Sequence, residues 1–109
     1  MQEDIIDYEG DVLPGNLAVI TTKHVIHGGA VIQLVVRDSE GDWQFLPHLE
    51  EISESDAMIM GLDTIVNLDT SVLETLKMPL SHKAWRRDSL SAWQYYPYTD
   101  EQSHQLPDV

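Results

Sequence analysis

The segment Asn16–Leu46, NLAVITTKHVIHGGAVIQLVVRDSEGDWQFL, carries the strongest strand and turn signals in this chain. Two of its parts, Val31–Arg37 and Trp43–Leu46, are rich in β-branched or aromatic residues, which favour strands. The turn formers Asp38–Asp42 lie between them, and Gly41 can adopt the positive φ that a loop of this length commonly needs. We therefore predict a β-hairpin, around which the rest of the chain folds.

Alternation along the two strands predicts which face of this hairpin is buried. Successive side chains of a strand point to opposite faces, so Trp43 and Phe45 should share one face. The predicted partners of these two aromatic residues on the other strand are Ile32, Leu34 and Val36. We expect these five side chains to form the core face of the hairpin.

Two further strands are predicted near this segment. Leu17–Ile20 is a short apolar strand before the hairpin, and Ala57–Met60 is another that returns to the sheet after an acidic loop. Between the first strand and the hairpin, Thr21–His27 can form one helical turn, capped by a threonine and ended by Gly28–Gly29.

After the predicted strand at Ala57–Met60, the apolar residues recur at the spacing of a helix. Leu62, Ile65 and Val66 lie at positions i, i+3 and i+4, which predicts a short amphipathic helix over Leu62–Leu68. A second helix is predicted over Asp69–Lys77.

The cap of the second helix has two candidates, Asp69 alone or Ser71 together with Glu74. A late strand should then lie near Ala84–Arg87 or Trp93–Tyr96.

These elements together predict an α+β fold, a small and mainly antiparallel sheet with short helices packed on it. The length of 109 residues fits one domain. We place that domain at residues 16–98, after an acidic lead-in at 1–15 that is either flexible or held against the body by its apolar residues, and before a polar tail at 99–109.

The composition limits the classes of partner. A net charge of -13 argues against nucleic-acid binding through phosphates, which needs clustered Lys and Arg, and against anionic membranes. No apolar run approaches the roughly 18 residues that span a bilayer, and the acidic N-terminus is unlike a signal peptide. Cysteine is absent, which excludes disulfides. We therefore predict a cytoplasmic protein.

The charges are unevenly distributed along the chain. Fourteen of the nineteen acidic residues lie at or before Asp69. Four of the six Lys and Arg residues lie in a short stretch after it, at Lys77, Lys83, Arg86 and Arg87. The sequence therefore predicts a local basic patch in the C-terminal third of an acidic protein.

Residues between Leu17 and Arg87 form a pattern of strand, turn and cap positions. The pattern is made by Ala18–Thr21, His24–Ile26, Gly28–Gly29, Arg37–Asp38, Gly41–Phe45, Leu62, Ile65, Leu68–Asp69, Ser71, Leu80 and Ala84–Arg86. It resembles a group of small bacterial domains of unknown function that is related to immunity proteins of polymorphic toxin systems. This resemblance implies a protein that neutralises a toxin by occlusion.

Two groups of residues are candidates for binding a partner. An acidic group can be an ordinary solvated loop or an anionic patch that attracts a basic protein, such as a toxin. A second group can pack under the helices, with its arginines paired to the protein's own acidic residues, or it can form an interface hot spot, because Trp and Arg dominate interface energetics. The candidates are Glu50, Glu51, Glu54 and Asp56 in the first group, and Trp85, Arg86 and Arg87 in the second. The leading hypothesis is a non-catalytic protein-binding module.

The alternative hypothesis is a small enzyme or ligand-binding domain with its site near three histidines, His24, His27 and His48. Their spacing matches no tight metal-binding motif, and the chain has no nucleophile elbow. We therefore predict no catalytic residue, no metal site and no cofactor.

Overall fold

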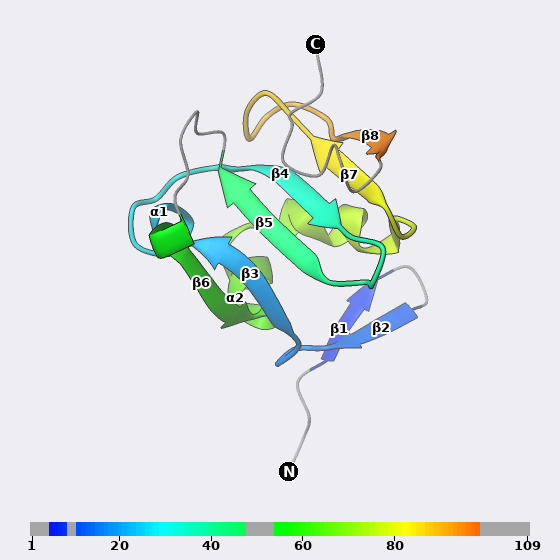
Figure 1. The fold of residues 1–109 in the computed structure, drawn as a ribbon, viewed down its shortest axis with the longest axis horizontal. Coiled ribbons are helices and arrows are strands. Elements are labelled where there is room, and N and C mark those ends of the chain that lie inside the picture. Colours follow the sequence, from blue (N-terminus) through cyan, green and yellow to red (C-terminus); the bar gives the residue numbers. More distant parts are fainter. Residues whose placement is uncertain (1–4, 9–10, 48–53, 99–109) are drawn as a thin grey trace.

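The computed structural model describes residues 5–8, 11–47 and 54–98 of the chain. Its centre is a six-stranded sheet (Figure 1). In the order in which they lie side by side, the strands are β6 (Ala57–Gly61), β3 (Ala18–Thr22), β5 (Trp43–Pro47), β4 (Ile32–Arg37), β7 (His82–Trp85) and β8 (Gln94–Pro97). β3 and β5 are parallel and the other neighbours are antiparallel. The predicted α+β fold with a mainly antiparallel sheet is confirmed.

The predicted hairpin is formed by β4 and β5. Gly41 has a φ of 91°, a conformation that glycine adopts without a steric penalty. The Oδ1 atom of Asp38 accepts hydrogen bonds from the backbone N–H groups of Glu40 and Asp42, each at 2.9 Å. The side chain of Asp38 therefore stabilises the turn.

The prediction for the core face is wrong at Leu34 and Val36. Phe45 lies opposite Val35, so Leu34 and Val36 point to the other face of the sheet. The register of the two strands shifts between Ile32 and Leu34, and this irregularity returns Ile32 to the main core. A second cluster on the other face consists of Leu34, Val36, Trp85 and Tyr98.

Two helical elements cover the main core face and lie behind the sheet in Figure 1. α2 spans Leu62–Leu68, with the predicted bounds, and it buries Leu62 and Ile65 completely. The second element, η2, is a 3₁₀ helix over Thr70–Lys77. Its cap is Asp69, whose side chain accepts a hydrogen bond from a backbone N–H of the first turn.

The predicted turn of helix after β3 is α1, Lys23–Ile26. The prediction of a threonine cap is wrong, because Thr22 occupies the cap position but its side chain makes no capping hydrogen bond. The end of the turn is as predicted. The N–H of Gly28 donates to the carbonyl of His24, and Gly29 has a φ of 72°.

Both candidates for a late strand exist, as β7 and β8. The predicted lead-in contains a two-stranded antiparallel hairpin, β1 (Ile5–Tyr8) and β2 (Asp11–Pro14), with Ile6 and Leu13 packed against the main core. A short 3₁₀ helix, η1 (Glu54–Asp56), precedes β6. The predicted polar tail lies outside the described residues.

Candidate protein-binding surface

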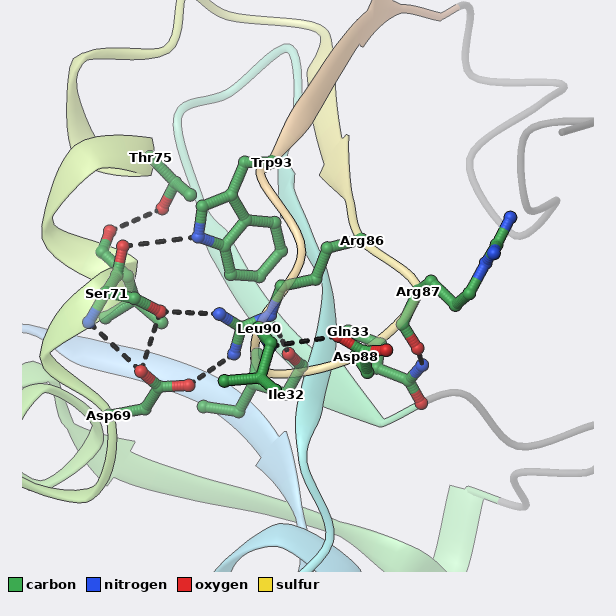
Figure 2. Close-up of polar contacts among 11 residues, drawn as sticks. Ile32, Gln33, Asp69, Ser71, Thr75, Arg86, Arg87, Asp88, Leu90 and Trp93 are labelled. Carbon is green, nitrogen blue, oxygen red and sulfur yellow. Dashed lines mark hydrogen bonds and ion pairs between the residues drawn. The ribbon is translucent and has the colours of Figure 1, made fainter.

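Arg86 lies at the centre of a buried hydrogen-bond network (Figure 2), and only 2% of it is exposed. Its Nε donates to the carbonyl of Ile32 at 2.9 Å, and its Nη1 donates to the Oγ of Ser71 at 2.7 Å. Its Nη2 forms an ion pair with the carboxylate of Asp69. The guanidinium carbon lies 4.2 Å from the ring centroid of Trp93, which is a cation–π contact.

Asp69 and Ser71 complete this network at the start of η2. The backbone N–H and the hydroxyl of Ser71 donate to the Oδ1 of Asp69, at 3.0 and 2.7 Å. The indole N–H of Trp93 donates to the carbonyl of Ser71 at 3.2 Å. Burial raises the pKa of Asp69, but the hydrogen bonds from Ser71 and Arg86 outweigh this effect and hold the pKa below its usual value. The hydrogen bonds of this network therefore hold the start of η2 against Arg86 and Trp93.

The candidate cluster at Trp85, Arg86 and Arg87 is divided by this packing. Trp85 is 7% exposed and belongs to the second cluster of the core. Arg86 is buried and forms an ion pair with Asp69. Arg87 is exposed, and its carbonyl accepts a hydrogen bond from the side chain of Gln33. The burial of Trp85 and Arg86 disagrees with the hypothesis that these two side chains face a partner.

The predicted basic patch is also largely absent from the surface. Lys83 is buried, with its ammonium group 5.8 Å from the ring centroid of Tyr98, and burial lowers the pKa of this lysine. Arg86 is buried in its network, so Lys77 and Arg87 are the exposed members of the patch. Two of the four basic residues of the predicted patch are therefore buried rather than at the surface.

The acidic candidates lie just before β6 in the sequence. Asp56, the last residue of η1, lies 3.3 Å from the Nζ of Lys23 and 3.4 Å from the Nε2 of His24. Glu54 begins η1. Glu50 and Glu51 lie outside the described residues.

The histidines of the alternative hypothesis do not meet within the described part of the chain. His24 contacts Asp56, His27 is exposed at the end of α1, and His48 lies outside the described residues. A cavity of about 150 Å³ lies nearby. It is lined by Val25, Gly29, Ala30, Ile32, Leu68 and Asp69, a set that includes no histidine.

An exposed apolar surface, which the sequence did not reveal, lies at the β6 edge of the sheet. Ile59 on β6 is 74% exposed, and its neighbour Ile20 on β3 is 37% exposed. Among the described residues, β6 pairs with β3 and with no other strand. We call β6 together with Ile20 the β6 surface.

Within β6 itself, three features that usually protect an edge strand from pairing with another chain are missing. Such strands commonly carry Lys, Pro or a bulge, whereas β6 has the sequence AMIMG and pairs with β3 in regular register over all five residues. The four consecutive apolar residues at Ala57–Met60 do not alternate with polar ones, so the sequence does not indicate which face of this strand is exposed. The exposure of Ile59 is set by the position of β6 in the sheet.

A comparison of the chain with models of protein families gave no match, and neither did comparisons with curated proteins or with solved structures. Within the described residues, no helix has the length and apolarity needed to cross a bilayer.

Proposed function

We propose that this chain is a non-catalytic protein-binding module that binds a basic partner protein at the β6 surface. The observation that carries the proposal is the exposure of Ile59 on β6, an edge strand without charged residues, next to Ile20 of β3. Apolar side chains exposed side by side at the edge of a sheet lose contact with water when a partner covers them.

The charge of the chain selects the class of partner. The net charge is -13, and two of the six Lys and Arg residues, Lys83 and Arg86, are buried. Such a surface repels acidic proteins and attracts basic ones, and complementary fields raise the rate of association. Four acidic residues, Glu50, Glu51, Glu54 and Asp56, immediately precede β6 in the sequence. The charge of the chain therefore favours a basic partner.

The narrower proposal is an immunity protein that occludes a basic toxin. Its support is the resemblance of Leu17–Arg87 to domains related to immunity proteins, together with the acidic surface. Gene order tests this narrower role. A toxin gene directly upstream would support it, and an operon of metabolic enzymes would favour the enzyme hypothesis instead.

Affinity capture tests the broader function. The tagged full chain is incubated with lysate of the native cell, and the captured proteins are quantified by mass spectrometry against an unrelated acidic bait of equal charge. We expect at least one basic protein to be enriched by this chain alone. The purified candidate should then form a complex with the chain on size-exclusion chromatography. Equal capture by both baits would contradict the proposal.

A further inference from the structure

We propose that the partner contributes an extended, basic segment that pairs with β6 as an additional strand of the sheet. This inference rests on the proposed function and specifies how the partner is bound. Alternate residues of an edge strand direct their backbone N–H and C=O groups away from the sheet, where a second chain can pair with them.

Both ends of β6 are fixed, so its edge is ready to accept a strand. At the C-terminal end, the N–H of Leu62 donates to the carbonyl of Leu17 at 2.9 Å, and the N–H of Asp63 donates to the carbonyl of Gly15 at 2.8 Å. At the N-terminal end, Asp56 contacts Lys23 and His24 of α1. Figure 1 shows α1 beside this end of β6. A preorganised strand loses little conformational entropy on pairing.

The side chains around β6 define the sequence that would fit. A strand added to β6 would place alternate side chains on the same face as Ile59 and Ile20, where apolar residues would extend the exposed row. Asp63 follows the strand, and the chain as a whole carries a net charge of -13, whereas Asp56 before the strand is already paired with Lys23 and His24. The fitting segment therefore alternates apolar and basic residues.

Charge decides between such a segment and a second copy of this chain. Two copies would bring two net charges of -13 together, and β6 has no basic side chain to offset the repulsion. A basic segment from another protein gains attraction at the same edge. We therefore assign the edge to a basic partner segment.

The probe for this inference is a capped nine-residue peptide of alternating lysine and valine, with a glutamate–valine peptide as its control. Binding to the full chain is measured by fluorescence anisotropy, and protection of backbone amides by hydrogen exchange. We expect the lysine peptide to bind at least tenfold more tightly than the glutamate peptide and to slow exchange in β6. N-methylation of every internal peptide nitrogen, which removes the N–H donors from both edges of the peptide, should abolish binding.

Two charge-matched variants locate the site of binding. Ile59→Lys places a charge on the edge, and Leu90→Lys adds the same charge at a residue that is 95% exposed in the turn after β7. We expect the first variant to weaken binding of the lysine peptide at least tenfold, and the second less than twofold. Equal effects of the two variants would overturn the inference, because the peptide would then respond only to overall charge.

Three other outcomes would also overturn strand addition. They are undiminished binding of the N-methylated peptide, failure of the lysine peptide to bind, and a wild-type dimer in light scattering that Ile59→Lys converts to a monomer. The last result would assign the edge to a second copy. Capture of a basic protein in the preceding experiment would still support a protein-binding function in each case, so the two proposals can fail separately.

Discussion

Arg86 and Asp69 form an ion pair that joins the residue after β7 to the cap of η2, although 17 positions separate them in the sequence. The same guanidinium bonds to the carbonyl of Ile32 at the start of β4 and covers one face of Trp93. One buried side chain therefore connects the sheet, the helical layer and the segment that leads to β8.

Arg86→Met should destabilise the fold by about 3–5 kcal/mol, because it leaves the Oδ2 of the partly buried Asp69 and the carbonyl of Ile32 without the donors that Arg86 supplies. The control is Arg87→Met, which removes the same functional group at an exposed position and should change stability by about 0.5 kcal/mol or less. Urea denaturation followed by circular dichroism measures both. Similar losses for the two variants would show that the network does not stabilise the fold.

Acid should remove the contribution of Asp69. Its pKa is lowered in the folded protein, so the ionised carboxylate stabilises the fold above the unfolded pKa of about 3.9, and this stabilisation is lost as the pH falls toward the folded pKa. The melting temperature of wild type should exceed that of Asp69→Asn at pH 7, and the difference should shrink below about pH 4. A difference that stays constant from pH 7 to pH 3 would contradict this assignment.

Trp43→Ala should cost about 3–5 kcal/mol of stability. The ring is buried, stacks on Phe45 with centroids 6.0 Å apart, and lies 5.2 Å from the guanidinium carbon of Arg37. Trp43→Phe, which keeps an aromatic ring, should lose clearly less. Thermal unfolding compares the two, and an alanine variant that melts within a few degrees of wild type would show that the ring contributes little.

The sequence predicted elements whose signals are local. Gly41 marked the hairpin turn, and the spacing of Leu62 and Ile65 marked α2 with its final bounds. It failed at Leu34, because a register shift beside Ile32 is a property of two paired strands and has no signal in either strand alone.

In the candidate site, too, the sequence predicted what depends on local signals and missed what depends on tertiary contacts. The sequence identified Arg86 as a residue that could pair with the protein's own acidic residues or face a partner. Only the tertiary fold shows that it forms an ion pair with Asp69. The sequence also predicted the strand that contains Ile59. That this strand ends the sheet follows from its pairing with β3, which no short-range pattern specifies.

Charge steering should be measurable once a basic partner has been captured. Changing Glu50, Glu51 and Glu54 together to glutamine should lower the association rate at low salt, because three charges of the anionic stretch are lost while side-chain shape is kept. The dissociation rate and the melting temperature should change little. Surface plasmon resonance at several salt concentrations measures the rates.

Salt supplies the control for this experiment. At high ionic strength the wild-type and triple-variant rates should converge, since screening removes long-range attraction between exposed charges. An association rate that is the same for both proteins at every salt concentration would show that these glutamates do not steer the partner.

Isothermal titration calorimetry of the captured basic partner with wild type, Ile59→Lys and Leu90→Lys shows whether the partner binds at the β6 surface. We expect Ile59→Lys to weaken binding at least tenfold and Leu90→Lys, with the same change of charge, to weaken it less than twofold. Both variants should melt like wild type. A partner that binds Ile59→Lys as tightly as Leu90→Lys would contradict the assignment of the β6 surface as the binding site.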